Sequence, residues 1–261
     1  MNFQKALLPT LAFSVLAPLS AQAPVREWYL DVHRFSPTFE GHFEGVQDGQ
    51  PLVFDTQRDL ALGKDSTKPG FALEYQGPRF GLEVSMSQQD YSGSNFLTRK
   101  ITVNGQDYNA GAQVDSKMKV TNSNFLWTIR AFKWDQAWVG VDLGARVWAM
   151  DLQVVGNEPF TGTSASANEK FPIPIPQIGL SGGFNALDRK LIARGYYHLL
   201  TYKGASYHHT GVDVRFFPIH WLGIRAFVDA ENFDVPKGSI KDDLQLVLDR
   251  KGTGFGVVLR F

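Results

Sequence analysis

Apolar and polar residues alternate with a period of two along most of the chain after residue 26. The segment 221–231 shows this most clearly, because Leu222 and Ile224 share one face while Arg225 and Asp229 share the other. An alternation of this kind predicts β-strands with one apolar face, and a helical period of 3.6 fits none of these windows. We expect ten strands, near residues 27–36, 70–77, 79–91, 118–133, 137–154, 173–185, 189–201, 207–217, 220–233 and 244–261.

The links between the expected strands alternate in length. Short links fall near residues 77–78, 133–136, 186–188 and 218–219, and the longer ones include 37–69, 92–117 and 155–172. Short turns at one end and long loops at the other are typical of outer-membrane barrels. The sequence therefore predicts an all-β fold, an antiparallel transmembrane β-barrel of about ten strands. Eight strands are an alternative, as are twelve if 39–44 and 51–60 also pair.

The first 23 residues have the three-part layout of a secretory signal peptide. Lys5 supplies the positive charge, residues 6–19 form an apolar stretch too short to span a bilayer, and small residues follow. Pro24 disfavours cleavage directly before it, so a cut after Ala21 competes with one after Ala23. We therefore expect a signal peptide at 1–23 and a single barrel domain at 24–261.

The last expected strand ends on an aromatic residue. Phe255, Val257, Leu259 and Phe261 occupy alternate positions on one face. This resembles the C-terminal signal of outer-membrane proteins, which the barrel-assembly machinery recognises. The resemblance departs at Leu259, where the family prefers Tyr. It implies a place in the bacterial outer membrane, and an even number of strands then places both termini in the periplasm.

The whole layout resembles small outer-membrane barrels of the OmpW-like and OmpA membrane-domain kinds. It is also similar to a set of uncharacterised outer-membrane proteins with an Asp-Leu-x-Leu segment before the second main strand, here Asp59-Leu60-Ala61-Leu62. The OmpW-like resemblance implies sideways passage of small hydrophobic molecules through the wall. Prolines at 172, 174 and 176, together with strand glycines 179, 182 and 183, are where we expect the wall pairing to weaken.

Composition and charge exclude several functions. The chain has no cysteine, which excludes disulfides, thiolate metal ligands and a cysteine nucleophile. Its 26 basic and 26 acidic residues balance, whereas nucleic-acid binding needs an excess of positive charge. We expect no nucleic-acid partner. The expected partners are outer-membrane lipid or lipopolysaccharide, the barrel-assembly machinery and, as an alternative, a small hydrophobic solute.

The polar faces of the strands predict a charged lumen. A barrel this small has an interior that side chains can fill, and acids facing arginines favour mutual pairing over an open channel. We interpret the lumen as a salt-bridged plug, with a narrow selective pore as the alternative. The residues expected to line it are Asp31, Glu74, Glu83, Arg130, Asp142, Arg146, Arg194, His198, Asp213, Arg215, Arg225, Asp229, Glu231 and Arg260.

Catalytic motifs are weak. Ser206, His208 and His209 lie together near a loop, but they do not match the His-x-Ser-Asn pattern of the lipid A deacylase family. Because neighbouring residues on a strand face opposite ways, the two histidines cannot serve one site. We expect no enzyme, no metal site and no cofactor. A lipid A acyl hydrolase and a recognition protein acting through its loops remain the alternatives.

Overall fold

The computed structural model describes residues 26–47, 49–157, 164–238 and 245–261. The predicted signal peptide, its two candidate cleavage positions and part of the predicted loop 155–172 lie outside these ranges. None of the described residues belongs to a helix long and apolar enough to cross a membrane.

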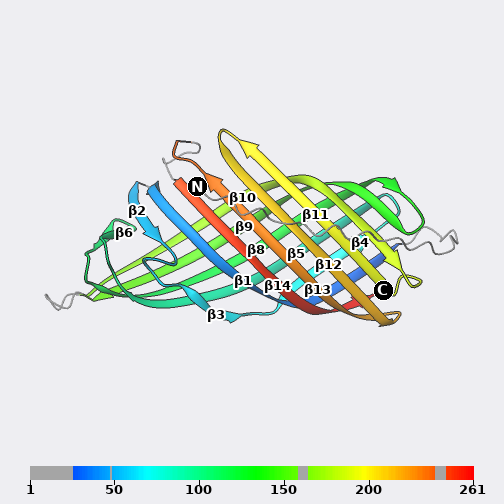
Figure 1. The fold of residues 1–261 in the computed structure, drawn as a ribbon, viewed down its shortest axis with the longest axis horizontal. Coiled ribbons are helices and arrows are strands. Elements are labelled where there is room, and N and C mark those ends of the chain that lie inside the picture. Colours follow the sequence, from blue (N-terminus) through cyan, green and yellow to red (C-terminus); the bar gives the residue numbers. More distant parts are fainter. Residues whose placement is uncertain (1–25, 48, 158–163, 239–244) are drawn as a thin grey trace, which may run out of the picture.

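The described chain forms one antiparallel sheet that closes on itself (Figure 1). The closed ring runs β14-β13-β12-β11-β10-β9-β8-β5-β4-β1, and β1 then pairs with β14. The all-β barrel that the sequence predicts is therefore confirmed. The ring strands are β1 Glu27–Gln47, β4 Gly70–Gln76, β5 Phe80–Phe96, β8 Gln113–Lys133, β9 Ala137–Asn157, β10 Ser164–Ala186, β11 Leu191–Tyr202, β12 Ala205–Ile219, β13 Leu222–Val235 and β14 Gln245–Arg260.

Four shorter strands lie beside this ring: β2 Gln50–Asp55, β3 Gly63–Thr67, β6 Ile101–Val103 and β7 Gln106–Tyr108. β2 pairs with the far half of β1, with His42 opposite Asp55. The segments 39–44 and 51–60 therefore do meet, but β2 is not part of the closed ring. The β6–β7 hairpin attaches to β2 through one pair, Val53 with Thr102.

The two ends of the barrel differ. β2 and β6 lie at one end, here called the loop end, and the C-terminal residue lies toward the other, the short-turn end (Figure 1). At the short-turn end, the amide of Trp28 donates to the carbonyl of Phe261 at 2.8 Å, and the amide of Phe261 donates back at 3.0 Å. These two bonds join the ends of the first and last ring strands.

Strand β8 changes polarity halfway along its length. Near the short-turn end, Phe125, Trp127 and Ile129 face outward and are exposed, while Asn124 and Thr128 are buried inside. Near the loop end the pattern inverts: Val114, Met118 and Val120 are buried inside, and Asp115, Lys117 and Lys119 face outward. Such a strand has the polarity of a membrane barrel in one half and of a water-soluble barrel in the other.

Strand β9 inverts at the same height. Val139, Leu143 and Val147 face outward in the first half, and Trp148 and Leu152 are buried inside in the second. The barrel therefore has an apolar outer belt toward the short-turn end, around a polar interior. Toward the loop end, a polar outer wall surrounds an apolar interior.

The wall contains one long seam. β10 pairs with β9 continuously from Ser164 to Phe184. Its pairing with β11, however, runs only from Ala186 to Gly179. Within the described residues, the edge of β10 from residue 164 to 178 has no ladder partner on the β11 side.

The prolines explain why β10 keeps one ladder and lacks the other. Pro172, Pro174 and Pro176 lie two residues apart, so their missing N–H groups all face the same way along the sheet. Because the ladder to β9 is continuous through all three, those positions face the seam. The expected weakening is thus found at the prolines, on the β11 side, whereas the β9 ladder stays intact. It is not found at Gly179, Gly182 and Gly183, which pair with both β9 and β11.

Candidate functional site

The polar interior brings together most of the residues that the sequence places in the lumen. Asp31, Glu74, Asp142, Asp213, Arg215 and Glu231 are buried, and Glu83, Arg225 and Asp229 are half-buried. They come from strands all round the ring and meet in three linked groups. Arginine suits this role because its planar guanidinium group binds two carboxylate oxygens at once.

The first group lies nearest the short-turn end. Arg215 pairs with Glu74 at 2.6 Å and with Asp213 at 2.9 Å. Arg225 also pairs with Asp213, and reaches Asp31 at 3.3 Å. Strands β1, β4, β12 and β13 are thus joined across the interior.

The second group centres on Arg194 of β11. Its guanidinium group lies 3.2 Å from Glu83 and 3.6 Å from Glu74, so it links to the first group. It also lies 4.0 Å from Asp142, which accepts hydrogen bonds from Thr128 at 2.6 Å and Ser181 at 2.8 Å. Four strands therefore converge on one buried carboxylate.

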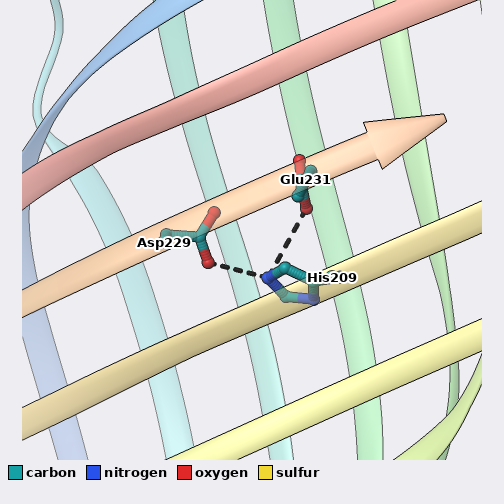
Figure 2. A group of neighbouring side chains, drawn as sticks. All are labelled: His209, Asp229 and Glu231. Atoms are coloured by element: carbon teal, nitrogen blue, oxygen red, sulfur yellow. Dashed lines mark hydrogen bonds and ion pairs between the residues drawn. The ribbon is translucent and has the colours of Figure 1, made fainter. Parts of the chain in front are cut away.

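The third group lies toward the loop end. Figure 2 shows the ring of His209, on β12, pointing at the carboxylates of Asp229 and Glu231, on β13. Its Nε2 lies 2.7 Å from Asp229 and 3.6 Å from Glu231. Arg146 pairs with Glu231, and Arg250 lies 2.8 Å from it.

A metal ion would fit the third group poorly. His209, Asp229 and Glu231 do place one nitrogen and two oxygens within 4.8 Å of one another. Arg146 and Arg250 already neutralise these carboxylates, however. A divalent cation would stand beside two guanidinium groups, so the arrangement is better explained as an ion-pair cluster.

Two histidines connect the second group to the third. His198 Nε2 lies 2.9 Å from Asp142, and His209 Nε2 lies 2.7 Å from Asp229. Their Nδ1 atoms face each other at 3.0 Å. A hydrogen-bonded row of four titratable groups thus runs from β9 through β11 and β12 to β13.

Some residues differ from the sequence expectation. Arg130 donates to the carbonyl of Gly77 at 2.7 Å and stacks on Trp138, and Arg260 donates to the carbonyls of Arg189 and His220. Neither is ion-paired within the described residues.

Two residues of the polar interior were not among those predicted. Arg250 is one, although alternation back from Arg260 puts it on the inward face. The missed His209 also lies on the inward face of its strand.

The second feature of the interior is an apolar cap at the loop end. We define the cap as β2, the turn 55–62, β6 and β7. Its fully buried side chains pack against the inner wall, including Trp148 and Phe39. The cap residues in this core are Leu52, Phe54, Leu60, Leu62, Ile101, Val103 and Tyr108.

Asp59 anchors the cap, which gives the Asp-Leu-x-Leu segment a structural role. Its carboxylate accepts from Arg99 Nε at 3.1 Å, from Arg58 and from the amide of Asp55. Burial opposes ionisation, but the bonds from Arg99 and Arg58 outweigh it, and they lower the pKa of this carboxyl below its usual range. Leu60 and Leu62 then enter the core.

Two small cavities lie inside the polar layer. One of about 80 Å³ is lined by His33, Arg146 and Asp229, among others. Another of about 40 Å³ is lined by Arg194, His198 and Arg215, among others. Each of these spaces is large enough to hold at least one water molecule.

The catalytic candidates separate as the strand geometry requires. His208 is exposed and hydrogen-bonded to Tyr197 at 3.0 Å, whereas His209 is buried. Ser206 shares the outward face with His208, because the two lie two residues apart. His209 therefore faces away from Ser206.

Comparison with known proteins identifies the fold. No protein-family model matches the chain, and no curated protein matches it in sequence. Its fold is similar to the crystal structure of the outer membrane protease OmpT from Escherichia coli, with a TM-score of 0.63 and 9% identity over 93% of this chain and 100% of that one. At this identity the likeness shows the fold alone: the chain has the fold of an outer-membrane β-barrel.

Two further matches are more distant. Ail, the attachment invasion locus protein of Yersinia pestis, gives a TM-score of 0.31 and 13% identity, covering 90% of this chain and 98% of that one. The outer membrane protein OprG from Pseudomonas aeruginosa gives a TM-score of 0.31 and 11% identity, covering 91% and 97%.

Proposed function

We propose that this chain is a non-enzymatic bacterial outer-membrane barrel whose axial path is closed. The apolar belt would lie in the membrane, with both termini in the periplasm and the loop end outside. One observation carries the proposal: two different layers, the ion-paired interior and the apolar cap, follow one another along the axis. A solute would have to break both to pass.

The ion-paired layer favours closure on energetic grounds. Opening it would separate charges such as Arg215 and Glu74, which are buried and 2.6 Å apart. Breaking a buried pair typically costs about 3–5 kcal/mol, because an uncompensated charge is left behind. Several such pairs share partners, so opening would disrupt several of them together.

Liposome swelling tests the proposal. Vesicles containing the purified barrel are diluted into solutions of small sugars and amino acids, and the rate is compared with protein-free vesicles and with vesicles containing a general porin. We expect the protein-free rate. Swelling that approaches the porin rate would reject closure.

Fractionation of the producing cells tests the location: the protein should be found with outer-membrane lipopolysaccharide.

A second candidate is passage of small hydrophobic molecules through the wall. The seam favours it, since the unpaired edge of β10 begins beside Gly179 at the height of the outer belt. Behind the seam, Gln177 of β10 donates to the hydroxyl of Tyr207 of β12 at 3.3 Å. Side-chain contacts are easier to open than a backbone ladder.

Disulfide cross-linking discriminates between the candidates, because the native chain has no cysteine. Ile178→Cys with Leu199→Cys would join the strands where the ladder stops. Leu180→Cys with Val141→Cys joins a pair already in a ladder and is the matched control. If the seam is a portal, oxidation should stop uptake of a hydrophobic solute in the first variant alone. Equal uptake in both would exclude it.

Assembly is a further proposed property. Phe255, Val257, Leu259 and Phe261 all face outward and are exposed, as a row of side chains read by the barrel-assembly machinery would be. Removal of Phe261 should lower the amount of assembled barrel in cells while refolding in detergent proceeds. Unchanged assembly in cells would reject this role.

A further inference from the structure

The row Asp142–His198–His209–Asp229 contains three hydrogen bonds, at 2.9, 3.0 and 2.7 Å. Each requires one hydrogen. Two ionised carboxylates supply none, and a neutral imidazole carries one ring proton. Two neutral histidines would therefore supply two protons for three bonds, and two nitrogen lone pairs would face each other at 3.0 Å. The row needs one more proton.

We propose that His198 and His209 form one buried proton-binding site, which holds a single excess proton between their Nδ1 atoms at neutral pH. The two rings then share three ring protons and one positive charge.

The groups that face this site come from every neighbouring strand. β9 contributes Asp142 and Arg146, and β11 contributes Arg194 and Tyr196. Tyr207 lies beside His209 on β12, and Asp229 and Glu231 face it from β13. Ser181 and Gln177 of β10 and Arg250 of β14 contact members of this set. Tyr196 donates to Asp229 at 2.6 Å and stacks on the ring of His198. The cavity that both rings line is also lined by charged residues of the first two groups, namely Glu83, Asp213, Arg215 and Arg225.

The site lies where the wall seam begins. His198 is opposite Gly179 in the last pair of the β10–β11 ladder. Only glycine fits there, since a Cβ would lie 2.2 Å from the carbonyl oxygen of Tyr197 and 2.6 Å from the His198 ring. Loss of the proton would break one of the three bonds that tie β9, β11, β12 and β13 at this point, and would loosen the start of the seam.

Nitrogen-15 NMR of histidine-labelled protein tests the proposal. His33→Gln is included in every sample, because His33 bonds to Asp31 and would add its own signal. An exposed histidine with an ordinary pKa of about 6.5 is about 10% protonated at pH 7.5. We therefore expect one full imidazolium equivalent from the pair at pH 7.5, beside about 0.1 equivalent from each exposed histidine. Three of the four ring nitrogens of the pair should be protonated.

His208→Asn is the matched control, because this neighbour faces outward. It should leave the full imidazolium equivalent of the pair unchanged, while His198→Gln and His209→Gln should each abolish that equivalent. If these two variants do not fold, the spectra of the wild type and of His208→Asn still show whether the pair carries the excess proton. Only neutral rings at pH 7.5 would overturn the proposal, as would a stoichiometric metal ion retained after chelator treatment.

Discussion

Gly93 lies directly against the backbone of Ala61. A Cβ at position 93 would lie 2.3 Å from the carbonyl oxygen of Ala61, and 2.4 Å from that of Leu60. The turn of the cap can therefore pack against β5 only because residue 93 has no side chain. The contact joins segments about thirty residues apart in the sequence.

Gly93→Val should displace the cap from the wall. Overpacking costs about 1–3 kcal/mol, so we expect the free energy of unfolding to fall by that amount. Limited proteolysis should cut within the turn 55–62 faster than in the wild type. Gly63→Ala is the control, because the nearest atom to its Cβ would be 3.9 Å away. Equal cleavage of the wild type and Gly93→Val would show that the contact does not hold the cap.

Acid should weaken the cap through Asp59. The pKa of this carboxyl is below its unfolded value in the native state, so its contribution to stability is present above the unfolded pKa. That contribution is lost as the pH falls from about 4 through the lowered folded pKa. Proteolysis of the turn at pH 3.5 and pH 7, with an acid-stable protease, should show this loss. In Asp59→Asn the turn should already be cleaved quickly at pH 7. If this variant resists the protease as well as the wild type does at both pH values, Asp59 does not anchor the cap.

Arg215→Met should destabilise the polar layer strongly. It leaves Glu74 and Asp213 buried without their shared partner. Removing one member of a buried ion pair costs about 3–5 kcal/mol. Arg34→Met is the control, because Arg34 is exposed, and it should change the free energy by at most about 0.5 kcal/mol. Urea unfolding in lipid vesicles measures both, and equal stability of the two variants would refute the pairing.

Pro174 should be replaceable, whereas its partner in the ladder should not accept proline. Pro174→Val keeps the bonds to β9, since the missing N–H faces the seam. Val147→Pro lies between two continuous ladders and removes a bond from one of them. The heat needed to unfold the barrel on SDS gels should change little in the first variant and fall in the second. A large loss in Pro174→Val would contradict the seam.

The alternation of residues predicted which side chains share a face but not how the whole barrel is lined. In β8 the apolar set is even-numbered at Val114, Met118 and Val120, then odd-numbered at Phe125 and Trp127. Alternation looks the same in both halves, since lipid outside and a core inside select equally for apolar residues. The charged lumen near the short-turn end was therefore predictable from the sequence. The apolar interior near the loop end was not.

The cap could not be predicted because it depends on contacts between distant segments. Leu60 and Leu62 lie in a turn without strand periodicity, and their burial depends on Gly93 and Arg99. The omission of Arg250 has a different origin. Its face followed from the pattern, but its partners on β13 depend on the register between strands.

Planar-bilayer recording tests the central claim of a closed lumen most directly. Purified protein is inserted at neutral pH, and insertion is verified independently by heat-modifiable migration of the recovered barrel. We predict no steady single-channel steps, because the ion-paired layer and the cap both lie across the axis. Large, steady conductance steps from the wild-type barrel would contradict the account.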